Sequence, residues 1–398
     1  MNILIIPSFL FTNDDRTLGS FIFEQAIALT KAGNNVYILY CDTFSLKYFD
    51  NYINYSELEF TEINGVKIYR KKTFCPLKCH NGVYGIAESF SKSIISLFNK
   101  HLSNIKFDII HAHCCVWAGY AAMKLSQSIN VPYVITEHSS MFALDSIVLH
   151  GNILSNVKHS FKEASRVICV SQGLKNYIKS YTDNIEIIGN VVDCDLFNIS
   201  QNDINQNEKF SFFTIFYMKN EAQVINKGVD LLISAFKLLI ERCPNCVLKI
   251  AGEGASKPFV QELIQSNSLQ SNVFLLGELN RNLVAKEMQS CNVFVLPSRY
   301  ETFGVSYAEA MACGKPVIGT YTGGPDTFVD ENSGILVPIN NIEALLLAME
   351  KIINNYNCYD PNVIRKKIVD QYSMSSISKY LNNLYKEVRD DFNNNSLF

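Results

Sequence analysis

The chain has 398 residues and a formal net charge of −3, from 35 basic and 38 acidic side chains. At about 100–200 residues per domain, this length favours two domains. A hydrophobic content of 48% with 18% charged residues excludes general disorder, and the near-neutral charge balance argues against a dedicated nucleic-acid binder. Twelve irregularly spaced cysteines are too few for a disulfide scaffold, which favours a reducing, cytoplasmic location.

The amino terminus predicts a buried strand. Residues 1–7 (MNILIIP) carry no basic segment before the apolar run, unlike a signal peptide. No uninterrupted apolar stretch approaches the roughly 18–20 residues needed to cross a bilayer. The sequence therefore predicts no membrane span, and it leaves contact with a membrane surface open.

In the first half, short β-branched runs alternate with amphipathic stretches such as 21–31, which ends at Gly33, a common residue after a helix. The runs lack polar alternation, which is typical of strands buried in a parallel sheet. This rhythm predicts a doubly wound α/β domain. The predicted strands are 3–6, 36–40, 108–111, 133–136, 167–170 and 185–188.

After a polar stretch at 198–209, a plausible linker, a second series of the same kind begins. A helix after Gly228 places Leu232, Ala235, Phe236 and Leu239 on one face. Two facing α/β domains would enclose a cleft, where ligands usually bind. The predicted strands are 212–216, 247–251, 273–276, 293–296, 316–319 and 334–337.

The first predicted strand is not followed by the glycine pattern of a dinucleotide site. Residues 7–12 read PSFLFT instead of Gly-x-Gly-x-x-Gly. A dinucleotide needs glycines there so that the backbone can approach its pyrophosphate. An NAD-dependent dehydrogenase is therefore disfavoured.

Segment 296–325 (LPSRYETFGVSYAEAMACGKPVIGTYTGGP) is the most informative part of the chain. A strand ends near Pro297, a loop carries Glu301 and Gly304, and a helix begins near Val305. The free N–H groups and partial positive charge of such a helix start suit a phosphate. Glu309, about one turn into the helix, is placed to bind sugar hydroxyls. The alternative is a surface loop and an ordinary helix with two solvated glutamates.

This segment resembles the E-x7-E region of retaining glycosyltransferases with the GT-B fold, of the family-4 or group-1 type. The stretches FDIIHAH (107–113), VITEHS (134–139), NKGVDLLISAF (226–236) and IAGEG (250–254) resemble further motifs of that family in order and spacing. The resemblance implies two facing Rossmann-like domains, at 1–197 and 210–374, with an interdomain cleft. It also implies a C-terminal helix, about 375–398, that crosses back to the first domain.

The resemblance also implies roles for individual residues. Lys227 neutralises the diphosphate of a nucleotide-sugar, Glu301 contacts the sugar, Glu309 holds the ribose and His138 faces the sugar from the first domain. Catalysis is thus assigned to His138, Glu301 and Lys227. Binding of the sugar donor is assigned to Gly19, Lys227, Glu253, Leu276, Arg299, Glu301, Thr302, Phe303, Gly304, Val305 and Glu309.

One position departs from the family pattern. Relatives often carry an arginine just after the strand that opens the second domain, where it shares the diphosphate with the lysine. Tyr217 stands at or near that position here. Lys219 or Arg299 is the candidate replacement, unless Lys227 acts alone. The loss of one charge-assisted contact weakens sugar-donor binding by a few kcal/mol at most.

Other motifs favour structural roles. Cys243 and Cys246 form a CxxC between a helix and a strand without a convincing second ligand pair, which indicates a turn. His111 and His113 resemble a metal pair but lack a carboxylate partner. The family generally needs no divalent ion, so neither a metal nor another cofactor is expected.

Between residues 61 and 110, eight basic residues face three acidic ones, a local excess of +5. Such a segment is either a solvated basic face or a surface for anionic lipid headgroups. The expected partners are a nucleotide-sugar, a glycan or lipid-linked acceptor and an anionic membrane surface, without nucleic acid.

The predicted function is a retaining hexosyltransferase that moves a sugar from a nucleotide-sugar, with UDP favoured, to an acceptor hydroxyl. The setting implied by the family is bacterial surface polysaccharide synthesis, in the cytoplasm or peripherally on the inner face of the membrane. The alternatives are a nucleotide-sugar epimerase, which would need acid–base groups beyond His138, and a non-catalytic partner subunit. The sequence names neither the base, the sugar, the acceptor nor the oligomeric state.

Overall fold

The computed structural model describes residues 1–11, 18–44, 58–74, 78–142, 151–200 and 209–395. The chain forms two compact units, Met1–Val191 with Met374–Phe398, and Val192–Ser373. The second unit thus begins at Val192, five residues before the predicted end of the first domain at 197. A backbone hydrogen bond attaches Val192 to the second unit, because its N–H donates to the carbonyl of Tyr372 at 2.8 Å. Most of the predicted linker, 201–208, lies outside the described residues.

Unit 1 contains an eight-stranded sheet in the order β3-β4-β2-β1-β5-β6-β7-β8. Every neighbouring pair is parallel except β3 with β4. The strands are β1 (Asn2–Pro7), β2 (Asn35–Phe44), β3 (Glu59–Ile63), β4 (Val66–Phe74), β5 (Ile109–His113), β6 (Tyr133–Glu137), β7 (Arg166–Cys169) and β8 (Ile185–Ile187).

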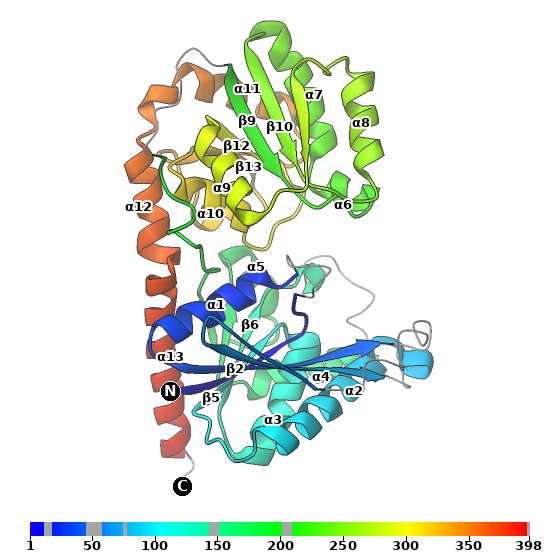
Figure 1. Ribbon diagram of the computed structural model, residues 1–398, viewed down its shortest axis with the longest axis vertical. Helices are drawn as coiled ribbons and strands as arrows, with labels where there is room; N and C mark the ends of the chain where they lie inside the picture. Colours follow the sequence, from blue (N-terminus) through cyan, green and yellow to red (C-terminus); the bar gives the residue numbers. More distant parts are fainter. Residues whose placement is uncertain (12–17, 45–57, 75–77, 143–150, 201–208, 396–398) are drawn as a thin grey trace. The chain divides into compact units, whose positions relative to one another are not determined.

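Helices cover both faces of this sheet (Figure 1). One layer pairs α1 with α13, and the other is built from α2, α3 and α4. The last helix of the chain therefore packs within unit 1. The helices are α1 (Ser20–Lys31), α2 (Lys78–His101), α3 (Tyr120–Ile129), α4 (Gly151–Glu163), α5 (Gln172–Ile178) and α13 (Met374–Asn395).

The β3–β4 hairpin was not predicted from the sequence. The sequence does carry the signal for such a hairpin, the dipeptide Asn64-Gly65. In the structure both residues adopt the positive φ that a two-residue hairpin turn requires, at 52° and 77°. The flanking residues alternate between polar and apolar, unlike the continuous apolar runs of the buried strands. A search for buried strands alone therefore misses this edge hairpin.

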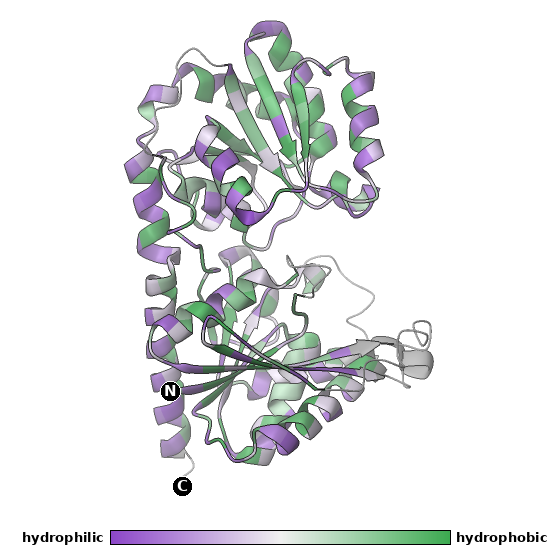
Figure 2. Ribbon diagram, in the orientation of Figure 1, coloured by the Kyte–Doolittle hydropathy of each residue, from purple (hydrophilic) through white to green (hydrophobic). Residues whose placement is uncertain are grey.

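Unit 2 contains a six-stranded, wholly parallel sheet in the order β11-β10-β9-β12-β13-β14. Strands β9 and β10 are mostly hydrophobic along their length (Figure 2), as strands covered on both faces must be. The strands are β9 (Phe210–Ile215), β10 (Cys246–Ala251), β11 (Val273–Gly277), β12 (Val293–Val295), β13 (Val317–Thr320) and β14 (Gly334–Val337).

Two helical layers again enclose the sheet, one with α7, α8 and α11 and one with α9, α10 and α12. The predicted helix after Gly228 is confirmed as α7, and its four predicted core residues are buried. The helices are α6 (Glu221–Asn226), α7 (Val229–Arg242), α8 (Lys257–Ser266), α9 (Arg281–Ser290), α10 (Val305–Ala312), α11 (Ile342–Asn354) and α12 (Pro361–Tyr372).

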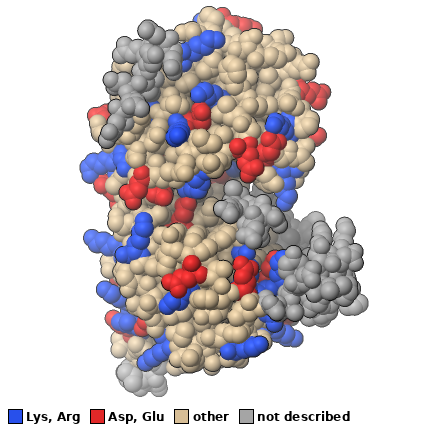
Figure 3. Space-filling view, in the orientation of Figure 1, with Lys and Arg blue, Asp and Glu red and all other residues tan. Residues whose placement is uncertain are grey.

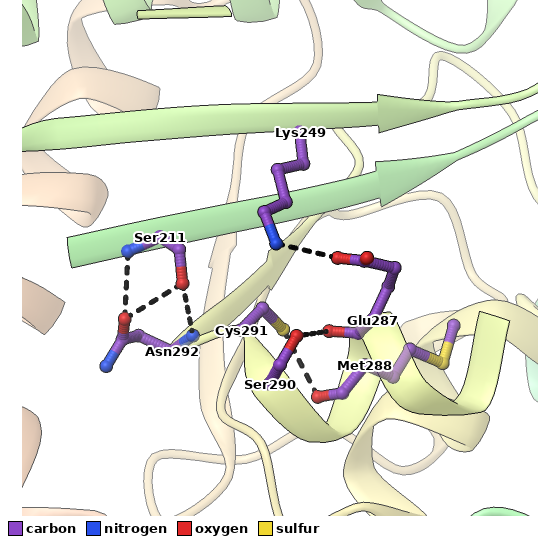
Figure 4. A network of polar contacts seen from close by, with 7 residues as sticks. All are labelled: Ser211, Lys249, Glu287, Met288, Ser290, Cys291 and Asn292. Carbon is purple, nitrogen blue, oxygen red and sulfur yellow. Dashed lines mark hydrogen bonds and ion pairs between the residues drawn. The ribbon is translucent and has the colours of Figure 1, made fainter. Parts of the chain in front are cut away.

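All twelve predicted strands are present, and eleven of them have shifted ends; the strand predicted at 36–40, for example, extends over 35–44, whereas 334–337 matches β14 at both ends. Asn292 holds the central pair of unit 2 together where both strands begin (Figure 4). Its side-chain oxygen accepts hydrogen bonds from the backbone N–H and the hydroxyl of Ser211, at 2.8 and 3.0 Å. Lys249 on β10 pairs with Glu287 on α9 at 2.8 Å. These contacts fix the sheet on which the site is built.

Among the described residues, no helix combines the length and the hydrophobicity that crossing a bilayer requires. Ten of the twelve cysteines, all except Cys75 and Cys79, are described as free thiols. Cys243 and Cys246 lie where α7 ends and β10 begins, at the turn that the sequence indicated.

Candidate active site

The chemically distinctive residues of unit 2 gather at the switch point of its sheet. Strands β9 and β12 are neighbours, but the strands connected to them extend toward opposite edges. In such sheets ligands bind beyond the carboxyl ends of the strands at this point. The segment after β9 carries Lys227, and the segment after β12 carries Glu301. The two positions predicted from separate motifs therefore flank the switch point.

Lys227 and Glu301 are in direct contact. The lysine Nζ lies 2.6 Å from the glutamate Oε1, and their side chains are 23% and 12% exposed. The same carboxylate oxygen accepts a hydrogen bond from the hydroxyl of Ser298 at 2.8 Å. Ser298 was not predicted, because a serine in a loop carries no signal of its own. The pair holds a partly exposed cation and a partly exposed carboxylate ready for a polar ligand.

Arg299 fixes this loop to the Lys227 segment. Its guanidinium contacts both carboxylate oxygens of Asp230 at 2.8 Å, and its backbone N–H donates to the carbonyl of Asn226 at 2.7 Å. The bond to Asp230 raises the pKa of Arg299. The Asp230 carboxylate already pairs with Arg299, so a contact of this guanidinium with a diphosphate in place of the arginine missing at Tyr217 stays a prediction.

The start of α10 is free of a side-chain cap. Gly304 occupies the capping position with φ 88° and no side-chain hydrogen bond. An added Cβ there would lie 2.7 Å from the ring of Tyr307, so only glycine fits without movement. The first N–H groups of α10, beginning with Val305, thus face a position that suits an anion. Thr302 is partly exposed beside them.

Phe303 contributes its backbone rather than its side chain. The ring is buried and lies 5.1 and 5.2 Å, between ring centroids, from Phe328 and Tyr372. This aromatic cluster anchors the loop between Glu301 and Gly304. A direct contact of the Phe303 ring with a ligand is therefore not expected.

Glu309 is buried, which excludes the alternative of a solvated glutamate at this position. Its carboxylate lies 3.0 Å from the guanidinium of Arg281 on α9. Burial raises the pKa of Glu309, and Arg281 opposes that rise. Arg281 was not predicted, since α9 belongs to no recognised motif. The ion pair keeps the second glutamate of the E-x7-E region in a fixed orientation.

The remaining predicted positions of unit 2 follow β9, β10 and β11. The side chain of Glu253 is 42% exposed and pairs with Lys257 at 2.8 Å. The hydrogen bond from Lys257 lowers the pKa of Glu253. Leu276 is partly exposed near the end of β11. Tyr217, two residues beyond β9, is 55% exposed, and Lys219 is also exposed. The exposed Tyr217 thus occupies the position for which the sequence resemblance implies an arginine.

Unit 1 holds the other two predicted positions. Gly19 precedes α1 with φ 71°, and an added Cβ would lie 3.0 Å from the carbonyl oxygen of Phe9. His138 follows β6 and is buried, with its ring 4.6 Å from that of Phe21 between centroids. Burial lowers the pKa of His138 to about 3. Its imidazole is neutral at pH 7 and can exchange hydrogen bonds with a ligand without carrying charge.

His138 belongs to a stack of three buried histidines that the sequence did not predict as a unit. Its Nε2 lies 3.0 Å from Nδ1 of His113, and the His113 ring stacks on His111 at 4.3 Å between centroids. His111 is anchored by Thr136 and by Tyr385 of α13, each at 2.6 Å. In the described part of the chain, no three or more His, Cys, Asp or Glu side chains are placed so that they could hold a metal ion together, and the stacked histidines are no exception.

Glu137 fixes the backbone that carries His138. It is fully buried and accepts N–H bonds from Cys115, His138 and Ser139, at 2.8, 2.9 and 2.7 Å. Burial raises the pKa of Glu137 to about 7, although these bonds oppose the rise. The glutamate of the VITEHS motif thus shapes the loop rather than facing solvent.

Comparisons with known proteins agree with this arrangement. The sequence model for Glycosyl transferases group 1 matches residues 201–387, and that for Glycosyltransferase Family 4 matches residues 18–196. An uncharacterized glycosyltransferase of Methanocaldococcus jannaschii is 27% identical over 357 residues, 84% of this chain and 88% of that protein.

Solved structures share the fold. Sucrose-phosphate synthase from Thermosynechococcus elongatus superimposes with a TM-score of 0.76 at 19% identity, over 98% of this chain and 99% of that one. Anabaena HepE in complex with UDP superimposes with a TM-score of 0.71 at 16% identity, over 97% of this chain and 100% of that one. With the two family models covering nearly the whole sequence, the chain belongs to the glycosyltransferases of group 1 and family 4, enzymes of class EC 2.4.

Proposed function

We propose that this glycosyltransferase takes a hexosyl group from a nucleotide-sugar, with a UDP-sugar favoured, and transfers it to an acceptor hydroxyl with retention of the anomeric configuration. The observation that carries the proposal is the contact between Lys227 and Glu301 at the switch point. A lysine, a carboxylate and an uncapped helix start meet there, and these groups match a diphosphate joined to a sugar. HepE, which shares the fold, was solved with UDP.

In this proposal Lys227 and the N–H groups of Gly304 and Val305 bind the diphosphate and stabilise the charge that grows on it as the sugar leaves. Glu301 orients the sugar hydroxyls. Because Lys227 already lies against Glu301, diphosphate binding requires the ammonium to share its hydrogen bonds between the carboxylate and the phosphate oxygens.

The assignments to His138 and Gly19 in unit 1, and to Glu309 as the ribose contact, follow the family pattern. A neutral His138 suits a hydrogen bond to a sugar hydroxyl. It is poorly suited to act as a general base, because burial lowers its pKa to about 3. This fits a front-face mechanism in which the leaving phosphate takes the acceptor proton, without a metal ion. The acceptor is proposed to be a glycan or a lipid-linked sugar of a bacterial surface polysaccharide.

A thermal-shift screen of the full chain tests the choice of sugar donor. We expect UDP and a UDP-sugar to raise the unfolding midpoint, because a ligand at 100 times its Kd stabilises the native state by about 2.7 kcal/mol. GDP, ADP and CMP, which carry other bases, are tested separately for comparison. A selective shift by another base would correct the choice of UDP. The absence of a shift with every nucleotide would contradict the proposal.

A further inference from the structure

A small basic pocket lies in unit 1 between strand β4 and helix α2. Its volume is about 290 Å³, at the low end of the about 300–1,000 Å³ typical of small-molecule sites. Three lysines line it, Lys71, Lys92 and Lys100, together with Thr73, Ser93 and Ser96. The Thr73 hydroxyl is itself buried, so the two serines are the hydroxyl donors of the pocket.

Regular geometry brings these groups to the same place. Lys92, Ser96 and Lys100 are spaced by four residues on α2 and therefore share one face of the helix. Lys71 and Thr73 are two residues apart on β4 and share one face of the strand. His101, the last residue of α2, also lines the pocket, and its ring lies 6.4 Å from that of Tyr69 between centroids. Cations and hydroxyl donors from two elements thus converge.

The acidic residues of the surrounding segment are engaged elsewhere. Glu88 pairs with Lys124 at 3.3 Å, and Asp108 pairs with Arg389 at 3.6 Å. Glu62 stands opposite Lys67 in the β3–β4 register. Of the residues described by the structure, no acidic one lines the pocket.

Two other basic residues of this segment lie over aromatic rings instead of lining the pocket. Lys67 lies over the ring of Tyr37 at 4.8 Å, and Arg70 lies over those of Phe11 and Tyr40, each at 5.6 Å. On the face shown in Figure 3, basic and acidic side chains are interspersed. The pocket gathers three of the eight basic side chains of this segment, Lys71, Lys92 and Lys100.

We propose that this pocket binds a phosphate group. Ammonium groups form strong charge-assisted hydrogen bonds with phosphate oxygens, and hydroxyl groups add further donors. The small volume suits a phosphate or a phosphate-bearing headgroup rather than a whole nucleotide-sugar. A soluble phosphate compound and an anionic lipid headgroup present the same chemistry to it. The site belongs to unit 1 and is independent of the Lys227 site in unit 2.

The competing explanation is that these lysines are only solvated. Lys100 lies in the last turn of α2, where a cation complements the negative end of the helix dipole. That explanation accounts for Lys100, but it gives no reason for Lys71 and Lys92 to face the same pocket. Binding measurements separate the two explanations.

The test titrates inorganic pyrophosphate into the full chain by calorimetry at fixed ionic strength. Every protein carries Lys227→Ala, so that pyrophosphate at the proposed sugar-donor site does not contribute. The test variant adds Lys92→Gln and Lys100→Gln, both at exposed positions of α2. The matched control instead adds Lys158→Gln and Lys162→Gln, which remove the same charge from exposed positions of α4 in the same unit.

We expect saturable binding whose Kd rises at least about tenfold, or about 1.4 kcal/mol, in the α2 variant but not in the α4 control. A second arm measures cosedimentation with phosphatidylcholine vesicles, with and without phosphatidylglycerol. Loss of pyrophosphate binding in the α2 variant would identify a soluble phosphate ligand, and loss of phosphatidylglycerol-dependent cosedimentation alone would identify a lipid headgroup. Equal behaviour of the α2 variant and the α4 control in both arms would overturn the proposal.

Discussion

Replacing Lys227 by alanine is expected to abolish the midpoint shift caused by the nucleotide and to lower kcat/KM for sugar transfer by roughly 10²–10³-fold, the loss typical when one group that stabilises transition-state charge is removed. The variant removes the cation that is proposed to bind the diphosphate. It also removes the hydrogen bond between Lys227 and Glu301, and the bond from the Ser298 hydroxyl to Glu301 remains. Initial rates with the nucleotide-sugar identified in the screen give the measurement.

Lys249→Ala is the matched control. Lys249 pairs with Glu287 at 2.8 Å in the same unit, with side chains 31% and 27% exposed, so the two variants lose similar ion pairs. Partly exposed pairs contribute about 0–1 kcal/mol to stability, and both variants should fold. Equal losses of activity in Lys227→Ala and Lys249→Ala would show that Lys227 has no special role.

Gly228→Ala is expected to destabilise unit 2 strongly. Gly228 has φ 70°, and an added Cβ would lie 1.9 Å from the carbonyl oxygen of Pro297. The strained backbone and the forced separation of the two site loops together cost roughly 3–5 kcal/mol. For a unit of 182 residues, 192 through 373, this corresponds to a fall in Tm of about 6–20 °C at 2–4 °C per kcal/mol. Scanning calorimetry measures the fall.

Gly277→Ala separates the contact from the backbone strain. Gly277 has φ 71° in the same unit, but the nearest atom to its added Cβ is 3.6 Å away, an ordinary contact. It should cost only the left-handed backbone penalty, about 1–2 kcal/mol. If both variants lowered Tm equally, the close approach of Gly228 to Pro297 would not be what holds the site loops together.

The fold could be predicted from the sequence because strands of a buried parallel sheet consist of continuous runs of apolar residues. Strand β12 (VFV) is buried throughout and carries no polar residue, and β9 (FSFFTI) carries only Ser211 and Thr214, both buried. The β3–β4 hairpin at the sheet edge alternates instead, and it was missed. The start of unit 2 at Val192 depends on a backbone bond to Tyr372, which no composition pattern encodes.

The site was only partly predictable for a related reason. Lys227, Glu301 and Gly304 belong to recognisable motifs, and the fold brings the first two together across 74 residues. The supporting partners of the site became visible only through tertiary contacts: Ser298 bonds to Glu301, Asp230 pairs with Arg299 and Arg281 pairs with Glu309. Arg299 illustrates the limit, since its position in the motif suggested a phosphate contact but gave no sign of its ion pair with Asp230.

Hydrogen–deuterium exchange with and without saturating UDP, or the nucleotide selected by the screen, tests the central claim most directly. The account predicts slower exchange at backbone amides of residues 226–230 and 302–308, where Lys227 and the start of α10 are proposed to hold the diphosphate. Protection confined to other segments, with these two unchanged under saturating nucleotide, would contradict it.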